Sequence, residues 1–399
     1  MPIICSRWCV AAVSFAVGAS LALTSCSPSP VKEPPTAPTD PVTPTDPVTP
    51  TDPVDPPLPD APSGGTAFLT PSKYLGGYSE ADWYEQNIPF VDLPDDQKPI
   101  QDVYYYRWRV YKEHLRYTDA ENGYVSTEFL DCCGYAAPFQ AINAAAAHHI
   151  TDGRWVRDRQ YGDDEIAFWL TGAGASAKPM TEGLNPDTSD WAHEYSFWLA
   201  SAAYGRAQVT GDFTQLKVLL PRLKTQYDGW AAQFDSSIGL YWVAPVWDAM
   251  EYAAPGYRAV DLNQGTPYQR DDEAYHGGQS FRTTLNSYQY GDALAIASIA
   301  DRVGDTATAA AYRDRAAKLK AAMTTYLWNP DTKFFYSVLR HNNPNHLQLT
   351  DKEQVGYLPW MFGAADASQA PAWSLLNDRT QGFGADYGPT TLARDSTLF

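Results

Sequence analysis

Two carboxylates among four aromatic side chains form the segment of this sequence with the clearest chemical potential. Within residues 241–252, Asp248 and Glu251 stand beside Tyr241, Trp242, Trp247 and Tyr252. A carboxyl group packed against an indole ring is poorly solvated, so its pKa rises and it can hold a proton near neutral pH. A general acid that cleaves a glycosidic bond needs this property, and Asp248 is therefore the candidate acid. The alternative is a loop held by buried aromatics, in which Asp248 only caps a turn.

If Asp248 is catalytic, its neighbours are predicted to contact the substrate: Trp242, Trp247, Glu251 and Tyr252. A second polar and aromatic cluster opens a predicted helix with Asn286, Tyr288 and Tyr290. Asn286 and Tyr290 lie one helical turn apart, so they share a face and could line a sugar pocket. An N-capped helix with packed tyrosines is the alternative. Glu128 precedes another helix and is a further candidate contact, with capping or a salt bridge as the alternative role.

The remaining polar motifs predict no cofactor and no metal. His148 and His149 end an alanine-rich predicted helix, where the helix dipole favours a cationic side chain. The acidic run 271–273 lacks the ligand spacing of a calcium loop. The sequence contains no nucleophile elbow, phosphate-binding loop or dinucleotide fingerprint.

Hydrophobic periodicity predicts helices far more clearly than strands, including helices over 102–117, 135–149, 159–170 and 193–209. A repeat lies within this pattern. One helical stretch runs from Gly211-Asp212 to Asp235 and precedes an aromatic segment that ends at Tyr241; another runs from Gly304-Asp305 to Asn329 and precedes 334–336. Repeated helical hairpins stack into a toroid or solenoid. The long connection over 242–283 is where a site is expected.

The N-terminal residues predict export rather than fold. An apolar run over 9–23 is too short for a membrane span and ends in Leu23-Thr24-Ser25-Cys26. This pattern resembles a bacterial lipoprotein signal, so we expect removal of residues 1–25 and lipidation of Cys26. An ordinary secretory signal is the alternative. Lipidation would anchor the chain to the lipid bilayer on the outer face of a membrane of the cell envelope.

Residues 26–65 are rich in Pro, Thr and Asp, with Thr-Asp-Pro-Val beginning at positions 39, 45 and 51. Such a segment forms no core and predicts an extended tether. The working domain is then 66–399.

With 29 basic against 47 acidic residues and a formal charge of -18, the chain is unsuited to nucleic acid. An acidic, aromatic-rich exported domain suits neutral carbohydrates, although the aromatics could equally be core. We expect a monomer. Cys132 and Cys133 are predicted to be buried thiols, because adjacent cysteines rarely bridge each other.

A series of motifs runs through residues 123–391: Gly123–Glu128, His148–Trp155, Tyr195–Ala200, Val209–Asp212, Trp247–Glu251, Leu285–Tyr288, Gly291–Ala295, Gly356–Trp360 and Tyr387–Thr391. In order and spacing these motifs resemble those of the mannosylglycerate hydrolase-like glycoside hydrolases, relatives of the processing α-glucosidase and trehalase families.

The resemblance implies an all-α (α/α)6 toroid in which the Trp-Asp aspartate, here Asp248, is the general acid. It also implies inversion, with a second carboxylate roughly 6.5–9.5 Å away as the base. In these families the base follows a segment rich in Trp, Gly and Pro, and no such segment follows Pro389. The predicted helices are also too few to close the ring. We therefore expect a C-terminally truncated enzyme, with Asp386 as a substitute base and Tyr387 as a substrate contact.

Two other classes of function remain open. Polysaccharide lyases and sugar epimerases also use helical toroids, but an acidic protein would repel a polyuronate. A surface lipoprotein that binds sugar without cleaving it, or a relic without its base, is the other class. The first expectation remains a glycosidase acting on a small glycoside or oligosaccharide.

Overall fold

A computed structural model describes four stretches of the chain: residues 69–131, 133–179, 184–263 and 277–399. The chain divides into two compact units, Met1–Asp52 and Pro53–Phe399, and every described residue belongs to the second. The predicted signal, the tether and Cys26 lie outside the described residues, as does the acidic run 271–273.

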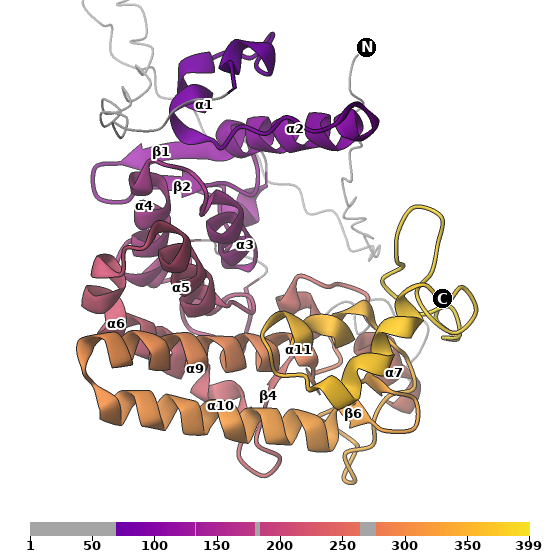
Figure 1. The fold of residues 1–399 in the computed structure, drawn as a ribbon. Coiled ribbons are helices and arrows are strands. Elements are labelled where there is room, and N and C mark those ends of the chain that lie inside the picture. The colour runs from indigo at the N-terminus through magenta and orange to yellow at the C-terminus, as the bar shows by residue number, and fades with distance from the viewer. Residues whose placement is uncertain (1–68, 132, 180–183, 264–276) are drawn as a thin grey trace, which may run out of the picture. The chain divides into compact units, whose positions relative to one another are not determined.

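The described chain opens with two helices and a β-hairpin, coloured indigo to purple in Figure 1. The elements are η1 (Pro71–Lys73), α1 (Ala81–Asn87), η2 (Asp95–Gln97), α2 (Lys98–His114), β1 (Leu115–Asp119) and β2 (Gly123–Ser126). The helix predicted over 102–117 corresponds to α2. It begins earlier because a proline suits the first helical turn, and it ends at His114 because Leu115 is extended and starts β1.

Helical hairpins form most of the rest of the described structure. The elements up to the candidate site are η3 (Gly134–Ala136), α3 (Asn143–Gly153), α4 (Arg159–Leu170), η4 (Ala173–Ala175), η5 (Trp191–His193), α5 (Leu199–Thr210), α6 (Thr214–Asp228), η6 (Gly229–Gln233), β3 (Phe234–Asp235), β4 (Leu240–Val243), η7 (Pro245–Asp248) and α7 (Ala254–Asn263). Those that follow are β5 (Ser280–Phe281), α9 (Thr283–Val303), α10 (Thr306–Tyr326), β6 (Trp328–Asn329), β7 (Phe334–Phe335), β8 (Val338–Leu339), η8 (Gln354–Tyr357), α11 (Leu358–Met361) and η9 (Ala367–Leu376).

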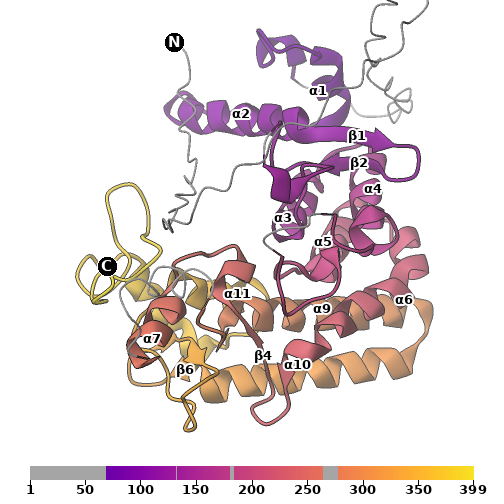
Figure 2. The ribbon, with the colours of Figure 1, turned by 180° about the vertical axis from the view of Figure 1, so that it is seen from behind.

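Helix α9 lies at the centre of the packing. It contacts α10, α5 and α6, and Figures 1 and 2 both show it antiparallel to α10 along its whole length. Every residue from Thr283 to Ala293 is buried, polar ones included. Buried polar groups usually have hydrogen-bond partners, and in this first half of α9 Thr284 and Asn286 find theirs inside the protein, whereas the Gln289 side chain and Asp292 Oδ2 have none.

The predicted repeat is confirmed in the structure. Helices α5 and α9 end at Gly211 and Gly304, whose positive φ angles of 72° and 77° favour glycine. The aspartate after each glycine then supports the next helix: Asp212 accepts from the Thr214 amide at 2.9 Å and Asp305 from the Thr308 amide at 3.0 Å. Each outer helix is followed by a pair of short antiparallel strands, β3–β4 in one case and β6–β7 in the other.

These short strands depart from the all-α prediction, although the structure is mostly helical. Strands β3, β4, β5 and β8 form one antiparallel sheet in that order. Trp242 on β4 pairs with Phe281 on β5, and Phe281 pairs with Val338 on β8. The sheet therefore joins chain segments that surround the predicted site.

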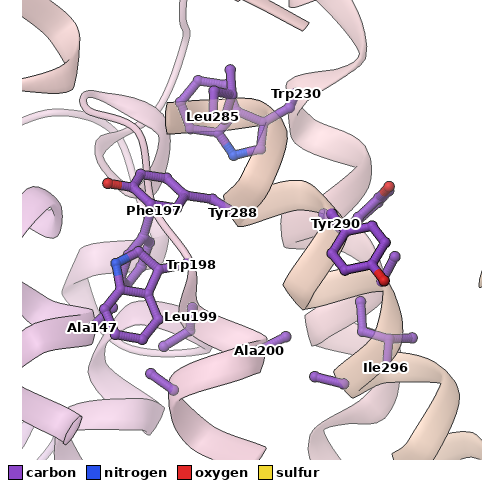
Figure 3. Close-up of a cluster of buried hydrophobic side chains, with 14 of the residues drawn as sticks. Ala147, Phe197, Trp198, Leu199, Ala200, Trp230, Leu285, Tyr288, Tyr290 and Ile296 are labelled. Carbon is purple, nitrogen blue, oxygen red and sulfur yellow. The ribbon is translucent and has the colours of Figure 1, made fainter. Parts of the chain in front are cut away.

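The main hydrophobic core is built by residues of α3, α4, α5, α6, β4, α9 and α10. Figure 3 shows a part of it, at the start of α5 and along α9. The rings of Trp198 and Tyr288 lie 6.3 Å apart, and both pack against Phe362, at 5.4 and 5.6 Å. A separate cluster holds the C-terminal segment, with Phe334, Tyr357, Phe383 and others buried together.

Two local predictions are wrong. Helix α3 continues to Gly153, so His148 and His149 do not end it. His148 packs edge-on against Trp198, and burial lowers the pKa of His149 to about 4, so His149 is neutral at physiological pH. Cys133 is disulfide-bonded rather than a free thiol. In the described part of the chain, no helix combines the length and apolarity that a membrane crossing requires.

Candidate active site

A tight turn after β4 positions Asp248. The single 3-10 turn η7 ends at Asp248, and Ala249 follows with a φ of 56°, which reverses the chain. The Trp247 carbonyl accepts a hydrogen bond from the Ser196 amide at 2.8 Å. This bond ties the turn to the segment that leads into α5, so Ser196 and Asp248 meet although they are distant in sequence.

The Asp248 carboxyl is buried among donors from two other segments. The Ser196 hydroxyl donates to Oδ1, and Thr284 Oγ1 donates to Oδ2 at 2.6 Å. Arg282 Nη1 lies 3.3 Å from Oδ2, and the Asp248 side chain is only 1% exposed. Burial raises the pKa of Asp248 above its ordinary value, while the guanidinium and the two hydroxyls oppose that rise. Burial is the largest of these effects, so the group is biased towards holding a proton.

A second carboxylate lies on the other side of Arg282. Arg282 Nη2 is 3.3 Å from Glu353 Oε1. Glu353 also accepts hydrogen bonds from the Ala254 amide at 3.2 Å and from Ser337 Oγ at 3.1 Å. The site is therefore a row of alternating charge, carboxylate–guanidinium–carboxylate, supplied by η7, the start of α9 and the segment before η8.

A cavity of about 450 Å³ borders this row, a volume in the range of small-molecule sites. Its lining includes Glu251, Tyr252, Tyr257, Arg282 and Glu353, together with Ala249, Met250, Ala253, Ala254, Gln354, Val355, Thr391, Leu392 and Leu398. A larger cavity of about 730 Å³ lies between α6, the β3–β4 loop and α10. Arg282 and Glu353 line the smaller cavity and not the larger one, so the smaller one is the candidate site. Asp248 itself lines neither cavity and adjoins the smaller one through its neighbours Ala249 and Arg282.

The predicted contacts around Asp248 divide into two groups. Glu251 and Tyr252 line the cavity from its exposed rim. Trp247 is buried beside Tyr195, with ring centroids 5.6 Å apart. Trp242 is also buried, and the Arg340 guanidinium lies 3.8 Å from its ring centre. The two tryptophans are therefore part of the buried interior and do not line the cavity.

The predicted cluster on α9 supports the site from within the protein. Asn286 accepts from the Tyr241 amide at 2.8 Å and donates to the carbonyls of Tyr241 and Arg282 at 2.8 and 2.6 Å. Its amide thereby fastens β4 to the residue that contacts Asp248. Tyr290 donates to the Gly363 carbonyl at 3.2 Å. Burial raises the pKa of Tyr288, and the nearby Asp248 charge adds to the rise. The packed-helix alternative describes Asn286 and Tyr290 best.

The remaining predicted site residues lie elsewhere. Glu128 is half-buried in the loop after β2, where its amide donates to the Gln140 carbonyl at 2.8 Å, and burial raises its carboxyl pKa. Asp386 is exposed and pairs with exposed Arg379 at 2.7 Å. Tyr387 is fully exposed. None of these three residues lines the cavity beside Asp248. In the described ranges, no group of three or more His, Cys, Asp or Glu side chains could hold a metal ion.

Sequence reasoning did not assign a role to the partners of Asp248. Ser196 lies inside a segment that carried the family resemblance, so it could have been marked as a candidate. Arg282 and Thr284 directly precede another such segment at Leu285. Glu353 has no local signal, because only the packing of η8 against α9 brings it to Arg282.

The class of protein follows from comparison with a known family. The family described as the mannosylglycerate hydrolase MGH1-like glycoside hydrolase domain matches residues 138–399. Because that match spans well over half of the chain, the chain belongs to the MGH1-like glycoside hydrolase family. No curated protein matches it significantly.

Three solved structures can be compared with this chain. A structure titled "Sialidase" is 30% identical over 80% of this chain, with a TM-score of 0.64. The GH63 mannosylglycerate hydrolase from Thermus thermophilus in complex with glucose is 13% identical over 57% of the chain, with a TM-score of 0.42. Neutral trehalase from Saccharomyces cerevisiae is 14% identical over 64%, also at 0.42. The chain spans 26%, 59% and 55% of these three proteins.

Proposed function

We propose that the chain is the helical part of an inverting glycosidase in which Asp248 is the general acid. The observation that carries this proposal is a buried carboxyl, biased towards protonation, next to a cavity of about 450 Å³ in a glycoside hydrolase fold. A general acid must hold a proton at working pH and release it to the leaving oxygen. Burial supplies the first property, and the Arg282 guanidinium stabilises the carboxylate that remains after proton transfer.

Inversion also requires a general base that activates water on the opposite face of the sugar, roughly 6.5–9.5 Å from the acid. Glu353 is an unsuitable base, because an amide, a hydroxyl and a guanidinium already occupy its oxygens. Asp386 does not line the cavity. We therefore assign no base among the described residues.

The proposed substrate is a small neutral glycoside or oligosaccharide. The cavity volume fits one or two sugar rings, and the charge of -18 disfavours polyanions. The sialidase activity named for one relative is not carried over, since this chain spans 26% of that protein.

We further propose anchoring to the bacterial envelope through lipid on Cys26. Metabolic labelling with a fatty acid should mark the wild-type protein and leave Cys26→Ser unlabelled; equal labelling would remove the anchor from the account.

One observation favours a second candidate, a sugar-binding domain without catalysis. Both Asp248 oxygens already have protein partners and the side chain is 1% exposed, which would also suit a structural carboxylate. An Asp248 of that kind would stabilise the cavity wall, and sugar would bind without being cleaved.

A panel of aryl α- and β-glycosides and small disaccharides separates the two candidates. It should be run on the wild type, on Asp248→Asn and on Asp386→Asn, and also on a version extended through any downstream reading frame. Hydrolysis by the wild type or the extended form that only Asp248→Asn abolishes supports the glycosidase. Saturable sugar binding without hydrolysis in any form favours the binding domain.

A further inference from the structure

Arg282 is shared between two carboxylates inside the protein. Its side chain is 1% exposed, and its two terminal nitrogens lie at the same distance, 3.3 Å, from Asp248 and from Glu353. Its Nε and Nη1 have no hydrogen-bond partner in the structure. The guanidinium is therefore held by charge on both sides and is saturated by neither carboxylate. One cation between two ionised carboxylates leaves a net negative charge in a poorly solvated place, which favours binding of one proton.

The partners of the two carboxylates differ in a way that selects where this proton goes. Each oxygen of Asp248 has a hydroxyl partner, Ser196 on Oδ1 and Thr284 on Oδ2. A hydroxyl can accept as well as donate, so it can turn to receive a bond from a protonated carboxyl. Glu353 has a single hydroxyl partner, Ser337 on Oε2, while its Oε1 faces the Ala254 amide and Arg282, which only donate. The proton is therefore accommodated more readily on Asp248, where both oxygens have adaptable partners.

From this geometry we propose that Glu353 is a positioning residue for Asp248. It fixes Arg282 midway between the two carboxylates, and its own negative charge keeps Arg282 from neutralising Asp248, so that Asp248 is the group that retains the proton. The proposal rests on the proposed function only in that Asp248 is taken as the catalytic acid. Glu353 itself transfers no proton in this scheme.

The groups that act electrostatically on Asp248 come from each element packed against it. They are Arg282 and Thr284 at the start of α9, Tyr288 one turn further along α9, Ser196 before α5, and Glu353 before η8. Of the charged groups among them, Arg282 favours the ionised form of Asp248 and Glu353 favours the protonated form. Removing the charge of Glu353 should therefore make Asp248 more acidic.

The test is a direct titration of Asp248 by NMR of carboxyl carbons in protein labelled with ¹³C at the aspartate side chain. Asp248→Asn assigns the signal, because it removes one resonance. In Glu353→Gln the midpoint of Asp248 should fall by about one pH unit or more, as expected for loss of a nearby like charge. Glu353→Asp keeps a carboxylate, but its shorter side chain cannot reach both Ala254 and Arg282, so we expect a smaller fall in the Asp248 midpoint. This variant serves as the test if Glu353→Gln does not fold.

Asp386→Asn, an exposed position, is the matched control and should leave the midpoint unchanged. If Glu353 is only structural, its variants will lower the melting temperature without moving the Asp248 midpoint, and that result would overturn the proposal. The titration does not depend on turnover. Persistence of hydrolysis in Asp248→Asn would thus remove the proposed function while leaving the titration result intact. Where turnover is measurable, the alkaline limb of the pH profile should move down with the midpoint.

Discussion

The carboxyl groups of Asp248 and Glu165 are both buried, yet they lie in different surroundings. Asp248 has hydroxyl and guanidinium partners and a second carboxylate nearby, and it lies beside a cavity. Glu165 on α4 accepts from the Ser126 amide at 2.6 Å and from Trp169 Nε1 at 3.2 Å, and burial raises its pKa to about 8. The Glu165 carboxyl therefore has a structural role and links α4 to β2.

Asp292 on α9 resembles Glu165 rather than Asp248. Its Oδ1 accepts from the Ser201 amide at 2.7 Å, its Oδ2 has no partner, and burial raises its pKa to about 8. A shifted carboxyl pKa is therefore found in the interior as well as at the candidate site. The distinguishing features of the site are a shared cation, adaptable hydroxyl partners and an adjoining cavity, so these features carry the assignment.

The largest expected effect separates Asp248 from Asp292 by activity. Asp248→Asn should reduce kcat/KM by about 10²–10⁴-fold, because an amide cannot donate the catalytic proton. Asp292→Asn should change kcat/KM by less than about threefold, since surface and structural changes away from the reacting atoms act only indirectly. Steady-state kinetics on a hydrolysed aryl glycoside measure both. Comparable losses in the two variants would erase the distinction between the two regions.

A second prediction concerns Asn286, which supports the site without lining it. Asn286→Ala should lower the free energy of unfolding by about 2–4 kcal/mol, because it leaves buried main-chain groups of β4 and Arg282 without partners. Urea unfolding measures the change, and exposed Asn377→Ala is the control, expected within about 0.5 kcal/mol. If Asn286→Ala is as stable as the wild type but binds sugar poorly, Asn286 is a substrate ligand after all.

Much of this arrangement follows from the sequence. The Trp247-Asp248 motif and the aromatic segment around it pointed to the candidate acid, and the glycine-aspartate repeat predicted the hairpins. The rest depends on long-range packing. Arg282 and Glu353 meet Asp248 through tertiary contacts that leave no spacing in the sequence, and the strand pair β4–β5 bridges a long loop. The prediction that His148 and His149 end their helix is wrong, because no local signal shows that α3 continues to Gly153.

The third prediction uses pH to characterise the structural carboxyls. The folded-state pKa of Asp292, about 8, exceeds its unfolded value of 3.8. Its contribution to stability is therefore complete below about pH 4 and is lost as pH rises through 8. Asp292→Asn places an amide nitrogen where Oδ2 has no partner and retains the bond from Ser201, so the variant should show a flatter stability profile and exceed the wild type above pH 8. Parallel profiles in chemical denaturation would contradict this.

Glu165→Gln should behave differently from Asp292→Asn at acidic pH. Both Glu165 oxygens accept from N–H groups, so the amide nitrogen of glutamine must face a donor. We expect a loss of about 1–3 kcal/mol at pH 5. The same denaturation series measures it. A stability at pH 5 equal to the wild type would mean that Glu165 does not tie α4 to β2.

The smallest effect is expected at the rim of the cavity. Glu251 is exposed and lines the cavity, so Glu251→Gln should raise KM about two- to fivefold with kcat nearly unchanged, since it weakens substrate binding in ground and transition states alike. A matched change at exposed Glu113, on α2, should leave both constants at wild-type values. If both KM and kcat are unchanged in Glu251→Gln, Glu251 has no part in sugar binding.

The central claim, that Asp248 donates the proton to the leaving group, is tested most directly by varying that group. Rates of the wild type and of Asp248→Asn should be compared on one sugar carrying either a poor leaving group, such as an alkyl alcohol, or an activated dinitrophenol, which needs no protonation. The account predicts a loss of about 10²–10⁴-fold on the alkyl glycoside and a much smaller loss on the dinitrophenyl glycoside. Equal losses on both substrates would contradict it and would leave Asp248 as a structural carboxylate.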